Sequence, residues 1–265
     1  MERYVIRGGR EGYDRLKILA RTRWPDTSAF LERIGLRGGM RCVDLGCGGG
    51  DVTLEIARIV GPDGSVVGVD MDEVKLDLAR SAAAEKGLSN VEFHAGNVND
   101  WTAPSGYDLV YSRFLLQHLS RPGDLLRRMW YGVCSEGVLA VEDVDFDGLF
   151  CEPPNAAFDF FASTFPRTIA RYGGDGSIGR KLHRLFLEVG IPDPQVKLVQ
   201  WAESSGDGKR LPLLTLEATA KSMVEGGLAT QQEIDAAAAD LAEFTNDPAT
   251  IVGSPRIFQV WASRA

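Results

Sequence analysis

A glycine-rich segment next to an acid is the part of this sequence best suited to ligand chemistry. The run "VDLGCGGGD" (residues 43–51) ends an apolar stretch at Asp44 and then turns. The turn contains Gly46, Gly48, Gly49 and Gly50. Because glycine has no Cβ, backbone amides in such a turn can approach a bound molecule closely. Asp70 ends the next apolar stretch about two dozen residues later, the usual offset for a carboxylate that holds ribose hydroxyls. The pair predicts a nucleotide-like ligand.

Details of the turn argue against the two commonest phosphate-binding motifs. A dinucleotide fingerprint counted from Gly46 would place Asp51 at its last position, where a carboxylate would lie near the pyrophosphate. No Gly-Lys-Ser/Thr follows the glycines, so the turn is not a P-loop. The residues from Asp44 to Gly50 read D-x-G-x-G-x-G instead. An NAD-dependent oxidoreductase is therefore a distant third among the functions that such a turn could serve.

The elements that must position these residues alternate along the chain. Apolar strand-like runs alternate with amphipathic helical segments, as in a parallel sheet covered on both faces. Strands are predicted at 40–46, 65–72, 90–96, 107–113, 137–146, 194–203 and 255–264, and helices at 11–36, 51–61, 73–87, 177–191 and over most of 211–244. We expect a doubly wound, mostly parallel α/β sheet, with a ligand crevice beyond the carboxyl ends of its strands.

The chain is expected to form a single domain, residues 1–265, with four parts. These are an N-terminal helical cap (1–38), a cofactor-binding core (39–146), a lid insertion (147–180), and the C-terminal part of the sheet with a helical insertion (181–265). The region of the lid is aromatic and contains Phe146, Phe150, Phe158, Phe160, Phe161 and Phe165. This character suits a flat, apolar small molecule, although several of these rings must pack the insertion onto the sheet.

Composition narrows the class of protein and its partners. The 265 residues carry a net charge of −8, which disfavours nucleic acid as a partner. The four cysteines form no CxxC pair and the N-terminus has no apolar signal core, which favours a reduced, cytoplasmic protein. No apolar stretch is long enough to span a membrane, and we expect no membrane partner. A monomer and a homodimer are both compatible with the sequence.

The D-x-G-x-G-x-G pattern, with Asp70 after it, resembles the class I S-adenosylmethionine-dependent methyltransferases of small molecules. The resemblance is specific through residues 40–146 and implies a Rossmann-like fold of seven strands. It implies S-adenosylmethionine as cofactor and S-adenosylhomocysteine as product. That cofactor has no phosphate and carries a positive sulfonium, so acids around the loop are compatible with it.

The same resemblance implies a role for each cofactor-binding residue. In the family the glycine loop holds the methionyl and ribose parts, which maps to Asp44, Gly46, Cys47 and Gly48. The acid after the second strand binds the ribose diol and its neighbour packs on adenine, which maps to Asp70 and Met71. The third motif maps to Asn97 and Val98, with the Asn97 carbonyl replacing the family's usual acid. Ser112 and Arg113 map beside the methionyl end, and Arg21 is the candidate for its carboxylate.

Candidate catalytic groups follow the fourth and fifth strands. His118 could accept a proton from the acceptor, and histidine at this place is also common as a structural residue. Glu142 and Asp143 lie at the carboxyl end of the fifth strand, where alternation allows at most one of them to face substrate. Asp143, Asp145 and Asp147 could share one face as hard ligands, but such a run is more often solvated, and we predict no metal.

These observations predict a methyltransferase of small molecules, in secondary or cofactor metabolism. The acceptor atom can be oxygen, nitrogen or carbon, because transfer from a sulfonium depends mainly on positioning and exclusion of water. A quinone-ring C-methyltransferase is the nearest alternative enzyme. A catalytically inactive cofactor-binding regulator or scaffold is the alternative outside catalysis.

Overall fold

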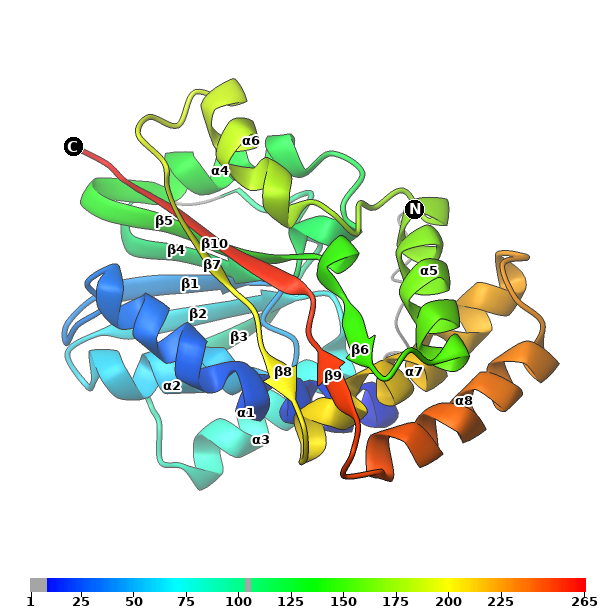
Figure 1. The fold of residues 1–265 in the computed structure, drawn as a ribbon. Helices are drawn as coiled ribbons and strands as arrows, with labels where there is room; N and C mark the ends of the chain where they lie inside the picture. Colours follow the sequence, from blue (N-terminus) through cyan, green and yellow to red (C-terminus); the bar gives the residue numbers. More distant parts are fainter. Residues whose placement is uncertain (1–8, 103–105) are drawn as a thin grey trace.

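A computed structural model describes residues 9–102 and 106–265, with side chains from residue 15 onward. Its main sheet contains β1 (Arg41–Leu45), β2 (Ser65–Asp70), β3 (Val91–Ala95), β4 (Tyr107–Arg113), β5 (Val133–Asp145), β7 (Gln195–Val199) and β10 (Arg256–Ser263). The strand order is β3-β2-β1-β4-β5-β10-β7 (Figure 1). Strands β1 to β5 pair in parallel, and β10 is antiparallel to both of its neighbours. The predicted mostly parallel, seven-stranded α/β sheet is confirmed.

Helices cover both faces of this sheet. One face carries α1 (Gly9–Arg33), α2 (Asp51–Val60) and α3 (Glu73–Glu85), and the other carries α4 (Pro122–Gly132) and α6 (Leu182–Glu188) (Figure 1). The alternation along β4 shows why both faces must be covered. Leu109 and Tyr111 belong to the apolar cluster under α1 and α2, while Val110 belongs to the cluster under α4 and α6. Successive side chains of a strand point to opposite faces, and here all three are buried.

A second group of elements extends beyond the carboxyl edge of the sheet. It contains the short strands β6 (Phe150–Glu152), β8 (Ala202–Glu203) and β9 (Ile251–Gly253), and the helices α5 (Ala156–Arg171), α7 (Leu211–Glu225) and α8 (Gln231–Asn246). The three strands pair in the order β6-β9-β8, and the helices share an apolar core that includes Phe158, Leu216 and Leu241. We call this group the lid lobe. The sequence predicts a lid from residues 147–180, whereas the structure also places the helices of the C-terminal part in it.

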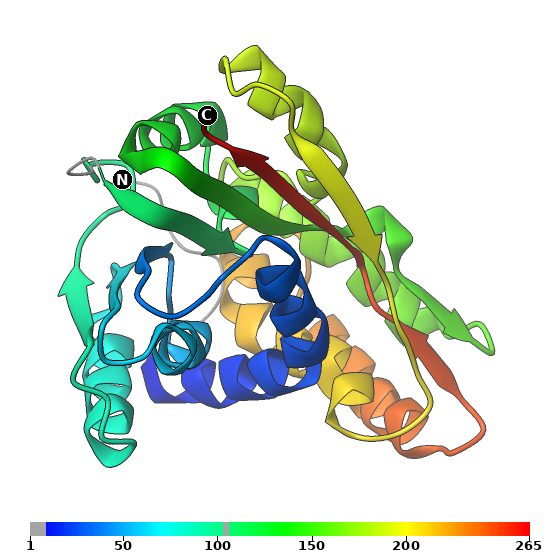
Figure 2. The same ribbon diagram turned by 90° about the vertical axis from the view of Figure 1, so that its left-hand side faces the viewer.

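The chain crosses between the main sheet and the lid lobe at three neighbouring places. These are the segments between β5 and β6, between β7 and β8, and between β9 and β10, which lie close together in Figure 2. Gln200 lies in the second crossing, and its Nε2 donates to the carbonyl oxygens of Gly148 (2.7 Å) and Ser254 (2.9 Å) in the other two. The Gln200 side chain therefore connects the three crossings by hydrogen bonds. Among the described residues, no helix combines the length and apolar character needed to cross a membrane.

Candidate functional site

A cavity of about 240 Å³ lies between the carboxyl edge of the main sheet, α1 and the lid lobe. Its wall on the sheet side is formed by the glycine turn after β1 and by residues that follow β2, β3 and β4. Its opposite wall comes from α5, α7 and the segment between β9 and β10. The predicted crevice at the carboxyl ends of the strands is therefore present, and the lid lobe covers it.

The glycine turn is held against β2 and requires glycine at several positions. The backbone N–H groups of Gly46 and Cys47 donate to the carbonyl of Val69, at 2.8 and 3.1 Å. Gly46 and Gly48 have φ values of 74° and 55°, in the left-handed region that side chains disfavour. A Cβ on Gly46 would lie 2.9 Å from the Leu115 side chain. The turn thus presents bare backbone to the cavity.

Asp70 is fixed in orientation by the same turn. Its Oδ2 accepts from the N–H of Gly48 at 2.9 Å, and its Oδ1 accepts from the N–H of Asp72 at 3.0 Å. A carboxylate can accept about four hydrogen bonds, so each oxygen can still accept another from a ligand. Asp70 lines the cavity and is ready to receive a pair of hydroxyl donors.

Two further acids line the cavity near the turn. Asp44 is buried, and its Oδ2 accepts from the Thr53 hydroxyl at 2.7 Å. Burial raises the pKa of Asp44 to about 6. Burial also raises the pKa of Asp51, and the positive charge of Arg113 opposes that shift. A cation bound here would oppose the rise in the pKa of both carboxyls, since a nearby positive charge favours a carboxylate.

Met71, Asn97 and Val98, the residues that the resemblance assigns to adenine, line the cavity. Met71 is 60% exposed, which is more than an apolar core residue shows and leaves its side chain available to a ring. The Oδ1 of Asn97 accepts from the N–H of Asn99 at 3.0 Å. That oxygen keeps one further lone pair for a donor such as the adenine amino group.

The side chains of Ser112 and Arg113 point to opposite faces of β4. Arg113 lines the cavity, and its Nη1 donates to Thr27 Oγ1 of α1 at 3.1 Å. Ser112 is the neighbouring residue along the strand, so its side chain points to the opposite face. It is fully buried there and does not line the cavity. Of the two residues predicted beside the methionyl end, only Arg113 is placed to contact a ligand.

Glu142 and Asp143 both lie outside the cavity wall. Glu142 is 2% exposed and accepts from the Tyr111 hydroxyl and from Gln259 Nε2, the latter at 2.8 Å. Asp143 is fully buried and accepts from the backbone N–H groups of Gln117 (3.2 Å) and Val144 (2.9 Å). Burial raises the pKa of Asp143 to about 7. Each of these carboxyls accepts hydrogen bonds from other parts of the protein. We therefore do not retain Glu142 and Asp143 as catalytic candidates.

The further acids of β5 and the residues after it are also engaged within the protein. Asp145 is buried, and both of its oxygens accept from Arg180, while Arg256 approaches it to 3.2 Å. Asp147 also pairs with Arg180, at 2.7 Å. Within the described parts of the chain, no three His, Cys, Asp or Glu side chains are arranged to hold a metal ion.

His118 lines the cavity as predicted, next to the turn that follows β4. The pKa of His118 is lowered to about 3, mainly by burial and in smaller part by the positive charges of Arg15 and Lys75. The imidazole is therefore neutral at physiological pH. A group of that pKa accepts a proton poorly, so His118 is better suited to hydrogen bonding than to general base catalysis.

Arg21 points away from the cavity, whereas Arg23, which was not among the predicted residues, faces it. Arg21 is 69% exposed and forms an ion pair with Asp207. Arg23 is 3% exposed and lines the cavity, together with Leu16 and Leu19 of the same helix. The spacing of Leu16, Leu19 and Arg23 is i, i+3, i+7, which defines one face of a helix. Applied to the N-terminal helix, this periodicity would have selected Arg23 and rejected Arg21.

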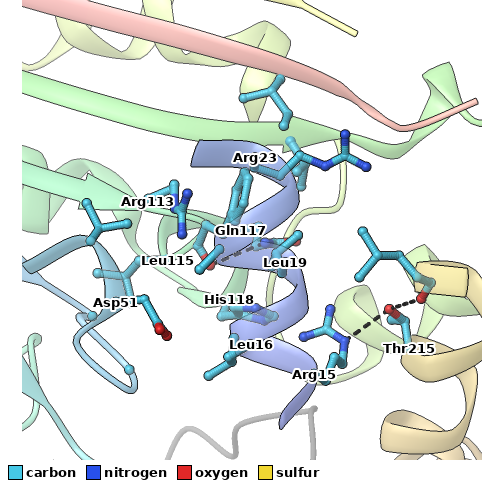
Figure 3. Close-up of a pocket in the computed structure, with 18 of the residues that line it drawn as sticks. Arg15, Leu16, Leu19, Arg23, Asp51, Arg113, Leu115, Gln117, His118 and Thr215 are labelled. Atoms are coloured by element: carbon cyan, nitrogen blue, oxygen red, sulfur yellow. Dashed lines mark hydrogen bonds between the residues drawn. The ribbon is translucent and has the colours of Figure 1, made fainter. Parts of the chain in front are cut away.

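Aromatic and apolar side chains form the lid side of the cavity. Of the phenylalanines predicted for the acceptor region, Phe146, Phe161 and Phe165 line it. The rings of Phe161 and Phe165 are stacked 5.6 Å apart, and Phe146 meets Phe165 edge to face at 4.9 Å. Arg15 of α1 donates from Nε to Thr215 Oγ1 of α7 at 3.1 Å, so α1 also contacts this side (Figure 3).

The fold and the site define a class I, S-adenosylmethionine-dependent methyltransferase. Residues 36–171, about half of the chain, match the family of proteins that share a methyltransferase domain, and the chain belongs to this family. S-adenosylmethionine, the methyl donor of this class, is thereby assigned as its cofactor.

Two named relatives are similar to this chain over part of its length. The chain is 32% identical over 134 residues to the ubiquinone/menaquinone biosynthesis C-methyltransferase UbiE of Yersinia enterocolitica, covering 50% of this chain and 53% of that protein. It is 31% identical over 157 residues to the trans-aconitate 2-methyltransferase of Methylobacterium radiotolerans, covering 59% and 56%. The chain thus spans about half the length of the curated relatives it matches.

Solved structures share the fold at low sequence identity. A SAM-dependent methyltransferase from Aquifex aeolicus superposes with a TM-score of 0.52 at 21% identity, over 70% of this chain and 91% of that one. The phosphoethanolamine N-methyltransferase 2 of Haemonchus contortus, solved with S-adenosyl-L-methionine, gives 0.57 at 15% identity, over 91% and 53%. At these identities the likeness concerns the fold alone.

Proposed function

We propose that this chain transfers the methyl group of S-adenosylmethionine to an oxygen, nitrogen or carbon atom of a small, apolar or aromatic acceptor. The observation that carries the proposal is one cavity that joins the glycine turn and Asp70 to an aromatic wall of the lid lobe. Cofactor and acceptor can thus meet in a space that protein covers on both sides.

The residues of the sheet side fit this cofactor. S-adenosylmethionine supplies an electrophilic methyl group on a positively charged sulfonium. Asp70 would accept from the ribose hydroxyls, the turn through Gly46 and Gly48 would leave room for the ribose and methionyl parts, and Arg113 would lie beside the methionyl carboxylate. Asp44 and Asp51 make the surroundings of the turn acidic, which favours a cation and disfavours a pyrophosphate.

The lid side would orient the acceptor and exclude water. Phe146, Phe161 and Phe165 offer a flat apolar surface, and a neutral His118 offers a hydrogen bond. Positioning and desolvation can supply much of the rate of a methyl transfer, so this arrangement needs no strong base. An acidic chain with an enclosed aromatic cavity also suits a small molecule better than nucleic acid.

Methylation of a quinone-ring carbon is the second candidate. It is favoured by the similarity to UbiE, which is named as a C-methyltransferase, and the aromatic wall is compatible with a ring. An inactive regulator or scaffold would bind the cofactor and turn nothing over. Production of S-adenosylhomocysteine with any acceptor from a phenol, amine and quinol panel would exclude that role.

Calorimetric titration with S-adenosylmethionine and S-adenosylhomocysteine tests the proposal. We expect both to bind the wild-type chain, and Asp70→Ala to weaken binding by roughly tenfold or more, the loss expected for a charged hydrogen-bond acceptor. Asp63→Ala is the matched control, because Asp63 is exposed in the loop after α2 and lies outside the cavity. Absence of binding to the wild-type chain, or equal binding by the two variants, would contradict the proposal.

A further inference from the structure

An ion pair between a buried arginine and a partly exposed glutamate in the cavity wall is not accounted for by cofactor binding. Arg23 of α1 donates from Nη1 to Glu203 Oε1 of β8 at 3.1 Å, and its guanidinium lies 4.1 Å from the ring centroid of Trp201. Both Arg23 and Glu203 line the cavity. The position of Glu203 depends on Gly208, where a Cβ would lie 2.6 Å from its Oε1. The pair is thus built from segments far apart in sequence.

The hydrogen-bonding capacity of Arg23 is mostly unused. A guanidinium has five N–H donors, and within the described residues Arg23 makes one hydrogen bond, to Glu203. Its side chain is nevertheless buried, with 4% of its surface exposed. Burying a guanidinium with so few hydrogen bonds costs stability unless other polar atoms accept from its remaining N–H groups. An oxygen atom of a ligand in the cavity would do so.

The position of Arg23 separates it from the cofactor loop. Leu16 of α1 lies next to the glycine turn, which we also call the cofactor loop: a Cβ on Gly48 would be 3.3 Å from its Cδ1. Arg23 is two turns further along α1, which is about 10 Å at 1.5 Å per residue. Figure 3 shows its guanidinium directed away from Asp51 and Arg113, and its partner Glu203 belongs to the lid lobe. Arg23 therefore faces the lid side of the cavity, whose wall also includes Phe161 and Phe165.

We infer that Arg23, held by Glu203 and Trp201, binds a carbonyl or hydroxyl oxygen at one end of an apolar, ring-bearing methyl acceptor. The ring would lie against Phe161 and Phe165, and the oxygen would take N–H donors that Arg23 leaves unused. Because Glu203 already balances the positive charge, a neutral oxygen suits the position better than a carboxylate. This inference rests on the proposed function and names the polar group that its acceptor must carry.

The test uses 1-tetralone and tetralin, two rings that differ by one carbonyl oxygen, on the chain saturated with S-adenosylhomocysteine. We expect calorimetry to show tetralone binding about tenfold more tightly, the ratio expected from one hydrogen bond to a charged donor. Arg23→Met should reduce the ratio to near one and leave S-adenosylhomocysteine affinity within about twofold, because Arg23 lies away from the cofactor loop. Arg21→Met is the matched control on the same helix, outside the cavity, and should change neither value.

Several results would overturn the inference. These are an unchanged ratio in Arg23→Met, a large loss of S-adenosylhomocysteine affinity in that variant, or no binding of either ring to the loaded wild-type chain. If Arg23→Met does not fold, Arg23→Lys keeps the charge and stem without the planar fork, and it should still lower the ratio. Failure of the proposed function itself is distinguishable. The wild-type chain would then either not bind S-adenosylhomocysteine, or bind it and produce none from S-adenosylmethionine with any acceptor of the panel.

Discussion

At the scale of single residues, burial sets the chemistry of the cavity more than residue type does. Asp44 and Asp143 are buried carboxyls whose pKa values rise to about 6 and about 7. The pKa of His118 is shifted in the opposite direction, to about 3. In each case loss of hydration disfavours the charged form. A sequence motif identifies such groups, but the protonation state depends on how much protein covers them.

Replacing His118 should make the protein more resistant to acid. The folded-state pKa of about 3 lies below the ordinary value of 6.5, so His118 stabilises the fold above pH 6.5 and loses this contribution as pH falls towards 3. We expect His118→Gln to gain about 2 kcal/mol relative to wild type between pH 7 and pH 5. Urea unfolding at the two pH values measures this change.

His183 provides the control for that experiment. It is exposed on α6, where its imidazole is hydrated in the folded and unfolded chain alike. His183→Gln should therefore follow the wild-type dependence of stability on pH. If His118→Gln also follows the wild-type dependence, His118 is not buried in its neutral form.

At the scale of elements, the glycine at the start of α2 is needed for packing against α3 and β3. Gly50 caps α2 with φ of 77°. A Cβ there would lie 2.9 Å from Ala79 Cβ of α3 and from the Phe93 ring of β3. The glycines of the turn thus serve two purposes. Gly46 and Gly48 keep the cavity side open, and Gly50 lets α2 and α3 meet.

Gly50→Ala should destabilise the fold more than a glycine substitution that suffers only backbone strain. Gly87 has φ of 67° with no atom within 4 Å of a Cβ, so Gly87→Ala isolates that strain. We expect Gly50→Ala to lose about 1–3 kcal/mol more than Gly87→Ala, because overpacking adds to the shared strain. Urea denaturation of both variants measures the difference. Equal losses would mean that α3 and β3 move aside at little cost.

At the scale of the whole molecule, the main sheet and the lid lobe have separate apolar cores with the cavity between them. The three crossings and helix α1 connect the two. Gln200 joins the crossings, and Arg15, Arg21 and Arg23 of α1 contact Thr215, Asp207 and Glu203 on the lid side. The geometry of the cavity therefore depends on contacts between segments that are distant in sequence.

Gln200→Ala should loosen the junction of the two lobes. It removes hydrogen bonds to the carbonyls of Gly148 and Ser254, and we expect a loss of about 1–3 kcal/mol together with faster amide exchange in the lid lobe. Hydrogen exchange followed by mass spectrometry measures the local effect. Gln195→Ala is the control, because Gln195 is exposed on β7 and, within the described residues, its Nε2 donates to the Asp193 carbonyl of the preceding turn and to no other group. Unchanged exchange in the lid lobe of Gln200→Ala would contradict this role.

The sequence by itself determined the seven-stranded sheet, the crevice at its carboxyl edge and the glycine turn that lines one side of the cavity. Strand alternation, glycine spacing and the offset between Asp44 and Asp70 are local features, and they act over a few residues of one strand or turn. Gly46 and Gly48, which these features select, line the cavity, as do Met71 and Asn97, which the resemblance to the methyltransferase family adds. A local sequence pattern is sufficient to predict a lining residue where one short segment of the chain forms that part of the wall.

Only the tertiary structure decided the lid side and the orientation of charged residues. The lid lobe combines α5 with α7 and α8, and a pairing between such distant segments leaves no periodic signal in either. Arg21 and Arg23 are two residues apart on a helix, which rotates one into the cavity and the other into solvent. Glu142 was a candidate by position, but β10 pairs beside β5 and places Gln259 against its carboxyl. The direction of a side chain depends on what packs beside it, and that is fixed only when the whole chain has folded.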